Sequence, residues 1–251
     1  MSKPLSDVHT AVTPIKGRRV LITGGTTGIG RAIGRLLAAE GGRIFTFGRN
    51  AQHLDDALTD FSAVTADCGG MVADAAKPED VESVFAEVDK LFKGLDVLVA
   101  NAAIAAEGLA DEDDWRRAIE IDLMGYLAFA RGAAERMKAG GHIVLIGSIS
   151  AEYRGKNSSV YVAAKSALQG FAFSFRREMA EKNIKVTLIE PGLVGTNMTD
   201  ASPAEQRRKI GKGQMLRAED IAVAVHYVLT QPERCVVMTM QIGELHREQD
   251  E

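Results

Sequence analysis

The sequence predicts a single α/β domain in which a doubly wound, parallel sheet of seven strands is covered by helices on both sides. Short apolar runs alternate with longer segments whose apolar residues recur at helical spacing. The short runs are apolar at consecutive positions, which is typical of strands buried on both faces of a parallel sheet. A sheet of this kind binds its ligand outside the carboxyl ends of its strands.

The predicted elements follow one another along most of the chain. Strands are expected at 18–23, 43–47, 70–74, 95–100, 142–147 and 184–190, and a weaker seventh at 235–242. Helical patterns fill the intervals, as at 78–92, where Val81, Val84 and Val88 share one face. Around this core the sequence predicts an N-terminal arm at 1–16 and a mobile polar loop at about 197–214.

Length and composition exclude several classes of protein. A chain of 251 residues fits one α/β domain, and its net charge of −4 argues against nucleic acid as the main partner. The longest apolar stretch, which begins at Val97, is interrupted and too short to cross a membrane. The first residues lack an apolar signal segment, so we expect a cytoplasmic protein whose Cys68 and Cys235 are buried free thiols.

The first strand ends in a glycine-rich turn, "T-G-G-T-T-G-I-G", at residues 23–30. Gly24, Gly28 and Gly30 allow a tight turn and let the backbone approach a pyrophosphate at the N-terminus of the following helix. A turn of this kind is weak evidence alone, but its position between the first strand and the first helix predicts a Rossmann-type dinucleotide site.

A second motif, "Y-V-A-A-K", places Tyr161 and Lys165 four residues apart in a helical pattern. Residues at this spacing share a helix face, with Cβ atoms about 5–6 Å apart. An ammonium held beside a phenol stabilises the phenolate, which favours proton transfer near neutral pH. The alternative is an ordinary helix edge on which the lysine head reaches solvent. The pair alone leaves both interpretations open.

Taken together, the motifs resemble the short-chain dehydrogenase/reductase family over about residues 17–242. The glycine spacing Gly-x-x-x-Gly-x-Gly is that of the family, and Tyr161 and Lys165 match its Tyr-x-x-x-Lys pair. Ser148 in "I-G-S-I-S-A" stands thirteen residues before Tyr161, as is usual in the family. Asn101 in "V-A-N-A-A-I" matches its Asn-Asn-Ala-Gly stretch, and "P-G-L-V-G-T" at 191–196 matches its Pro-Gly segment.

The resemblance implies an oxidoreductase that transfers a hydride between NADP(H) and a secondary alcohol or carbonyl compound. Ser148 would hydrogen-bond the substrate oxygen, Tyr161 would act as general acid/base, and Lys165 would hold the nicotinamide ribose. Residues 17–251 would then form one dinucleotide-binding and catalytic domain without a metal. The implied cofactor-binding positions are Gly24, Thr26, Thr27, Gly28, Ile29, Gly30, Arg49, Asp74, Ala75, Asn101, Tyr161, Lys165, Pro191, Gly192, Val194 and Thr196.

The end of the second strand indicates which dinucleotide is bound. NAD-binding sites place an Asp or Glu there to bind the ribose 2′-hydroxyl, but this chain reads "F-T-F-G-R-N". Arg49 suits a 2′-phosphate, by bidentate contact or by stacking on adenine. We therefore predict NADP, with NAD as the alternative if Arg49 is only a solvated surface residue. Asp74 resembles the family's adenine-contacting acid.

The chain departs from the family at the fourth catalytic position. The family usually has Asn there, whereas this chain has Asp122 in "I-E-I-D-L-M-G". An ionised Asp accepts hydrogen bonds but donates none, so its part in a proton relay could differ. The alternative is that Asp122 turns away and only caps or pairs locally.

Two further interpretations concern function and assembly. A non-catalytic protein that senses dinucleotides is the alternative function, and the retention of Ser148, Tyr161 and Lys165 argues against it. A related sugar epimerase would need a longer C-terminal substrate domain. Alanine-rich helices at about 111–138 and 158–181 carry more apolar residues than one sheet face needs. The resemblance implies that they pair in a homotetramer, with a dimer as the alternative.

Overall fold

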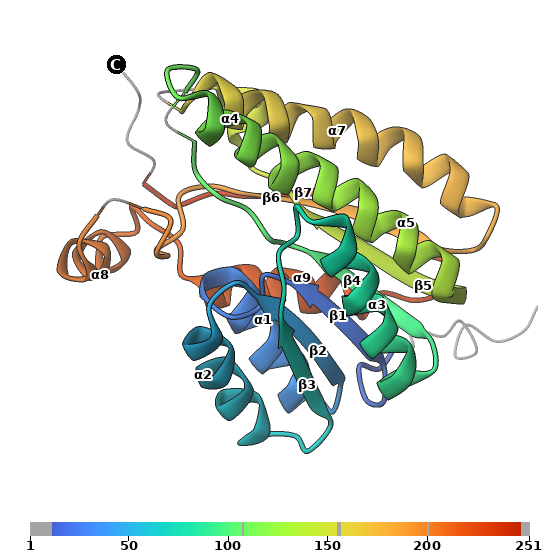
Figure 1. The fold of residues 1–251 in the computed structure, drawn as a ribbon. Coiled ribbons are helices and arrows are strands. Elements are labelled where there is room, and N and C mark those ends of the chain that lie inside the picture. The colour runs from blue at the N-terminus through green and yellow to red at the C-terminus, as the bar shows by residue number, and fades with distance from the viewer. Residues whose placement is uncertain (1–11, 107, 155–156, 200, 247–251) are drawn as a thin grey trace, which may run out of the picture.

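The computed structural model describes residues 12–106, 108–154, 157–199 and 201–246. Its centre is a seven-stranded sheet in the order β3-β2-β1-β4-β5-β6-β7, and every pair of neighbours is parallel. The predicted fold class is therefore confirmed (Figure 1). The strands are β1 Arg19–Thr23, β2 Arg43–Gly48, β3 Cys68–Val72, β4 Leu95–Ala100, β5 Met137–Ile146, β6 Lys185–Pro191 and β7 Thr239–Ile242.

Helices cover both faces of the sheet. One face carries α1 Gly28–Ala39, α2 Ala51–Ser62 and α9 Ala218–Leu229, and the other carries α3 Pro78–Phe92, α5 Tyr126–Arg136 and α7 Ser159–Ala180. α4 Glu112–Ile119 leads through a π-helical turn, η2 Glu120–Gly125, directly into α5 and lies beside α7 (Figure 1). The short helices α6 Ser150–Tyr153 and α8 Pro203–Gly211 follow β5 and β6 at the carboxyl edge.

The strands are apolar at consecutive positions because each face has its own core. In β1, Val20 and Ile22 pack on the side of α1 and α9, whereas Leu21 between them packs on the side of α3 and α5. All three side chains are fully buried. This is the burial that a sheet covered on both sides requires.

Three strands, β3, β5 and β7, differ from the predicted bounds by more than one residue. β3 begins and ends two residues earlier than expected, because it pairs with β2 from Ile44 with Cys68 to Gly48 with Val72. β5 begins at Met137 rather than at 142, since Met137 already pairs with Leu95 ahead of an irregularity in the register. β7 keeps only the last four predicted residues, because the chain turns at Cys235, whose N–H donates to Pro232 O.

The structure also bears on the predicted thiols, the N-terminal arm and the polar loop. Cys235 is exposed and Cys68 only partly buried, so the prediction of buried thiols is wrong. The arm at 1–16 lies outside the described residues up to position 11, and Thr13 hydrogen-bonds to the carbonyls of Thr230 and Gln231. The predicted loop at 197–214 contains a helix, α8. Within the described ranges, no helix has the length and apolarity needed to span a membrane.

Candidate active site

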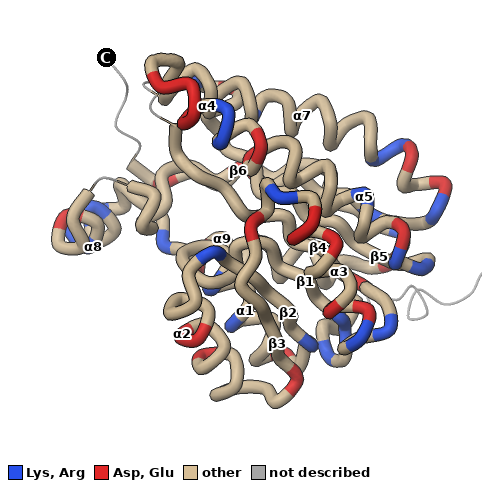
Figure 2. The backbone as a smooth tube through the Cα atoms, viewed as in Figure 1, with Lys and Arg blue, Asp and Glu red and all other residues tan. Residues whose placement is uncertain are grey.

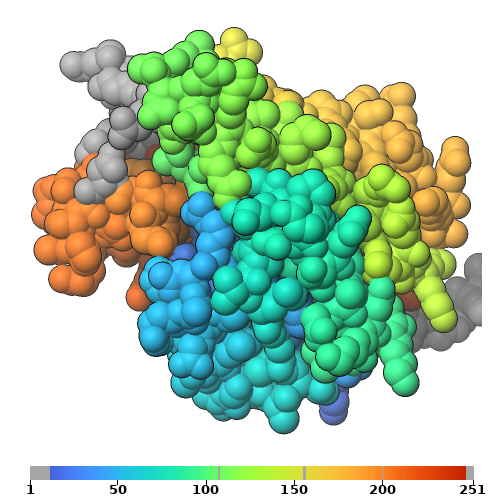
Figure 3. Space-filling view, viewed as in Figure 1, coloured from blue at the N-terminus to red at the C-terminus, as the bar shows by residue number. Residues whose placement is uncertain are grey.

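A cavity of about 1250 Å³ opens at the carboxyl ends of the strands. It is the position at which a doubly wound sheet binds its ligand. In the space-filling view, the surfaces of α8 (orange), α2 (blue) and α4 (green) surround this edge of the molecule (Figure 3). The cavity brings together every residue predicted for the site except Gly30 and Asp122, which lie behind its wall.

The glycine-rich turn forms one end of the cavity. Gly24 and Gly28 have φ angles of +65° and +51°, in the left-handed region that favours glycine. A Cβ placed on Gly30 would lie 2.5 Å from Gly24 O and 2.6 Å from Asn101 Nδ2. Thr27 precedes α1 without a side-chain cap, so the first amide groups of the helix are not occupied by that side chain. This donor set fits a pyrophosphate.

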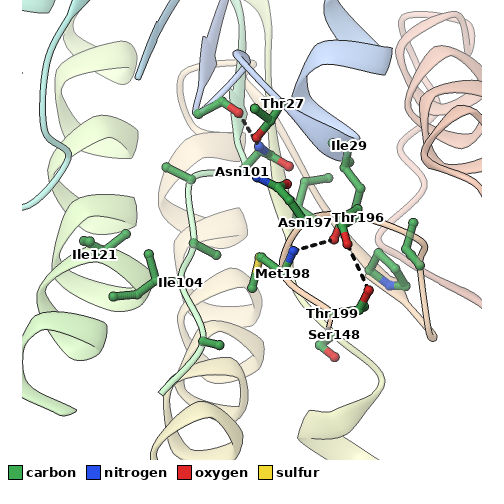
Figure 4. A pocket seen from close by; sticks show the side chains of 18 of the residues that line it. Thr27, Ile29, Asn101, Ile104, Ile121, Ser148, Thr196, Asn197, Met198 and Thr199 are labelled. Carbon is green, nitrogen blue, oxygen red and sulfur yellow. Dashed lines mark hydrogen bonds between the residues drawn. The ribbon is translucent and has the colours of Figure 1, made fainter. Parts of the chain in front are cut away.

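Asn101 fastens the end of β4 to this turn. Its Nδ2 donates to the carbonyls of Thr23 and Gly24 at 3.1 Å, and its N–H donates to Thr23 Oγ1 at 2.8 Å. The Thr23 hydroxyl accepts a second bond, from the Ala102 N–H. Asn101 therefore holds the turn in shape as well as lining the cavity (Figure 4).

The part of the cavity lined by Arg49 and Asp74 contains an ion pair that the sequence does not reveal. Arg117 of α4 pairs with Asp74, which follows β3, and Asp74 also accepts from the Ala76 N–H. Burial raises the pKa of Asp74, but these hydrogen bonds and the charges of Arg117 and Arg49 outweigh it and hold the pKa below its ordinary value. Asp74 is thus an anion engaged by Arg117, with Arg49 beside it on the cavity wall.

Ser148 and Tyr161 lie on the wall of the cavity away from the glycine-rich turn. Ser148 follows β5, and its Oγ accepts from the Ser150 N–H and donates to the Ser150 hydroxyl. Tyr161 lies in the first turn of α7, where its N–H donates to Ser158 Oγ at 3.2 Å. The Ser158 cap fixes where α7 begins and therefore where the phenol stands.

Lys165 lies one turn further along α7 and is 2% exposed. Its Nζ is 5.5 Å from the centre of the Tyr161 ring and 5.0 Å from that of Tyr126. Burial lowers the pKa of Lys165, but Tyr126, Asp122 and Tyr161 outweigh burial, so the pKa lies above its ordinary value. Lys165 is therefore an ammonium inside the protein, not a lysine whose head reaches solvent.

Asp122 supplies the charge that faces this ammonium. The carboxylate is 1% exposed, its Oδ2 lies 3.5 Å from Lys165 Nζ, and its Oδ1 accepts from the Ile104 N–H at 2.9 Å. Oδ2 has no hydrogen-bond partner among the described atoms, so its contact with Lys165 is one of charge. Burial raises the pKa of Asp122, and the Lys165 ammonium opposes that effect. Asp122 does not turn away from the site.

Tyr126 is a further residue that the motifs do not reveal. It is 2% exposed, and its hydroxyl donates to Ile146 O at 3.0 Å, at the end of β5. Burial raises the pKa of Tyr126 to about 12, so it stays a neutral phenol beneath Lys165. A tyrosine directly after Gly125, in a helix otherwise rich in alanine, is the only sequence signal for it.

The segment after β6 closes the cavity on the side of α8. Pro191, Gly192, Val194 and Thr196 all line it. Gln206 of α8 donates to Thr196 O and to the Thr199 hydroxyl, and so holds this segment in place. Figure 4 shows Met198 reaching from it toward the segment that carries Ile104. Glu244, another lining residue that the motifs missed, accepts from the Leu193 N–H at 3.2 Å.

Comparison with known proteins gives one consistent result. A family model described as short chain dehydrogenase matches residues 18–207. The chain is 31% identical over 227 residues to an uncharacterized oxidoreductase of Staphylococcus aureus (strain USA300), covering 88% of this chain and 95% of the relative. It is 32% identical over 225 residues to a 3-oxoacyl-[acyl-carrier-protein] reductase of Escherichia coli (strain K12), covering 85% and 90%.

A solved structure extends the similarity to three dimensions. A short chain dehydrogenase from Burkholderia cenocepacia J2315, in complex with NADP, superimposes with a TM-score of 0.83 at 30% sequence identity. The match covers 92% of this chain and 98% of that one.

The close packing around Gly30 generates a prediction with an internal control. Gly30→Ala should weaken dinucleotide binding at least about tenfold, because the new methyl group forces apart the turn and Asn101. Gly34→Ala, one turn further along α1, meets the buried Phe61 ring instead, and should lower the melting temperature with little effect on binding. Titration of dinucleotide fluorescence beside thermal melts separates the two. Equal affinity of the Gly30 variant and wild type would contradict the assignment of the turn.

Proposed function

The chain belongs to the short chain dehydrogenase family, and we propose that it transfers a hydride between NADP(H) and a secondary alcohol or carbonyl substrate. The observation that carries the proposal is the grouping of Ser148, Tyr161 and a buried Lys165 in one cavity with the glycine-rich turn. This grouping unites a proton donor, a hydrogen-bonding hydroxyl and a dinucleotide cradle. That combination suits carbonyl chemistry.

Arg49 supports NADP as the dinucleotide. Its guanidinium lines the adenosine end, where no carboxylate follows β2, and the similar Burkholderia cenocepacia enzyme is described in complex with NADP. An arginine there can bind a 2′-phosphate. Asp74 is paired with Arg117. In this proposal, it also contacts the adenine. When bound, the dinucleotide supplies or accepts the hydride.

The protein's own residues handle the proton. Ser148 holds the substrate oxygen by a hydrogen bond, and Tyr161 donates its phenolic proton to that oxygen as a carbonyl is reduced. In the oxidation of an alcohol, Tyr161 takes the proton back. Lys165 stabilises the phenolate that donation leaves, because its ammonium is fixed by burial and by Asp122. Asp122 acts as a member of the proton relay through this charge.

Removal of the phenol tests the proposal directly. Tyr161→Phe should keep the fold and the dinucleotide affinity, while kcat falls at least about a hundredfold, the low end for a positioned general acid. NADPH oxidation with a panel of carbonyl compounds provides the measurement. A protein that only senses dinucleotides would show no turnover in either form, and near-wild-type turnover of the variant would remove tyrosine from the mechanism.

Dinucleotide choice can be tested at Arg49. Arg49→Asp should raise the KM for NADPH and improve the use of NADH, through loss of a charge-assisted contact of about 1.5–3 kcal/mol. Arg35→Asp makes the same charge change on the exposed side of α1 and should leave the NADPH/NADH ratio as it was. A wild-type preference for NADH would show that the dinucleotide assignment is wrong.

The charge of Asp122 can be removed without changing the size of the side chain. Asp122→Asn deletes a buried negative charge 3.5 Å from Lys165 Nζ, so loss of a proton from Lys165 and the phenol beside it becomes easier. The midpoint of kcat/KM against pH should then move to lower pH, and the melting temperature should fall, because Lys165 loses the charge that offsets its burial. Superimposable profiles would mean that the relay runs through other groups.

Assembly is the last part of the proposal. α7 carries no charged residue from Ser166 to Phe175, which Figure 2 shows as a long uncharged stretch beside α4 and α5. Phe173 is 60% exposed there, and Met124 of η2 is 57% exposed. These exposed apolar side chains support pairing of the helices between copies, and we propose a homotetramer, with a dimer as the alternative. A cytoplasmic location stays a prediction from the sequence.

Light scattering at micromolar concentration should therefore give about four times the monomer mass. Phe173→Lys should lower that mass, because it places a charge in the paired surface. A monomeric wild type would refute the assembly.

A further inference from the structure

Ser150 places a second hydroxyl in the wall of the cavity, beside that of Ser148. Both residues line the cavity, and Ser148 is 7% and Ser150 9% exposed. The two hydroxyl oxygens lie 3.0 Å apart, and the Ser150 N–H donates to the Ser148 oxygen at 3.1 Å. Ser150 therefore contacts, with its backbone and its side chain, the hydroxyl that the proposed function assigns to the substrate oxygen.

The hydrogen-bonding capacity of a hydroxyl limits what Ser148 can do alone. A serine hydroxyl has one proton to donate and two lone pairs that accept. In the structure, the Ser148 proton is donated to the Ser150 hydroxyl, and one lone pair accepts from the Ser150 N–H. That proton must turn away from Ser150 before Ser148 can donate to a substrate oxygen. The bond between the two hydroxyls then persists only if Ser150 becomes its donor.

The Ser150 hydroxyl is placed to take the donor role. Among the described residues, its oxygen forms a side-chain hydrogen bond with Ser148 alone, so no other acceptor there competes for its proton. Reversal needs only rotation of the two hydroxyl protons, because the oxygens already lie at hydrogen-bond distance. The backbone on either side is fixed, since the Ile149 N–H donates to Pro191 O and the Ala151 N–H donates to Ser148 O.

We propose that Ser150 is a positioning residue for the reaction, which donates its proton to Ser148 while Ser148 donates to the substrate oxygen. The inference rests on the proposed oxidoreductase function and deepens it. Hydrogen bonds in a chain strengthen one another, because each donor polarises the next. As a hydride reaches the carbonyl carbon, negative charge grows on the carbonyl oxygen, so the chain of two hydroxyls stabilises the transition state more than the bound ketone. Neither serine loses its proton, because Tyr161 supplies the one that the oxygen takes.

Removal of the Ser150 hydroxyl tests the proposal. Ser150→Ala keeps the N–H that also contacts Ser148. With NADPH and acetophenone, kcat should fall about fivefold, the effect of one net hydrogen bond, while the KM for the ketone stays nearly unchanged. Ser166→Ala is the matched control, because the Ser166 hydroxyl donates to Ala151 O at 3.2 Å and so holds the same short helix, α6, at another residue. It should keep the wild-type kcat. An equal fall in both variants would mean that only the placement of α6 matters, and would overturn the proposal.

A double variant shows whether Ser150 acts through Ser148. Ser150→Ala should slow the wild type but hardly slow a Ser148→Ala protein, because the group through which it acts is then gone. The slow variants are followed as single turnovers, with the enzyme in excess over NADPH. Effects that multiply in the double variant would show that Ser150 acts on the substrate without Ser148, and would overturn the proposal.

Binding of an oxyanion separates this inference from the proposed function. 4-Nitrophenolate carries negative charge on an oxygen and is followed by its absorbance, so it stands in for the charged carbonyl oxygen. Titrated into the NADP-loaded protein, it should bind about fivefold more weakly to Ser150→Ala than to wild type. It should bind equally to Ser148→Ala and to the double variant. This measurement needs no turnover.

The outcomes distinguish the two ideas. The expected phenolate binding in a protein that reduces no ketone would reject the oxidoreductase and keep the role of Ser150. Turnover that Ser150→Ala does not slow would keep the oxidoreductase and overturn the role of Ser150, as would a phenolate affinity that this variant does not change. A wild type that neither reduces a ketone nor binds the phenolate would overturn both.

Discussion

The burial of one ammonium group organises the part of the cavity that holds Ser148 and Tyr161. Lys165 is almost fully removed from water, and an isolated charge in that position would be very costly. Asp122, which lies in η2, offsets this cost with its negative charge. Tyr126, the first residue of α5, lies beneath the same ammonium. The π-helical turn between α4 and α5 contains the carboxylate, as such turns often do at functional sites.

The parallel sheet brings the remaining groups to the same edge. Because all seven strands run in one direction, the turns after β1, β4, β5 and β6 all lie at the same edge of the sheet. Thr23 and Asn101 then join two of these turns by hydrogen bonds. The glycine-rich turn and the residues proposed to transfer the proton are therefore positioned by one sheet, although they come from distant parts of the chain.

Local patterns predicted the succession of strands along the chain, the glycine-rich turn and the Tyr161–Lys165 pair. What escaped prediction depends on contacts between distant segments. Arg117 lies 43 residues from Asp74 and Glu244 lies 51 residues from Leu193, and no periodicity links either pair. The π-helical turn escaped because one extra residue in a helix hardly changes its apolar pattern. The predicted start of β5 was too late because the first residues of this strand, around Gly140 and Gly141, carry no strand pattern.

The hydrogen bond from the Ile104 N–H to Asp122 fixes the position of the first residues after β4. The residues that follow Ile104 are not held by this bond. Asn101 is held by Thr23 and Ile104 is held by Asp122. An insertion or deletion between them would therefore displace the carboxylate that faces Lys165. The chain leading to α4 and the segment around α8 lie outside this constraint, so a change in their length need not move Asp122. Under the proposed function, substrate preference can therefore change through those two segments while the contact of Asp122 with Lys165 is kept.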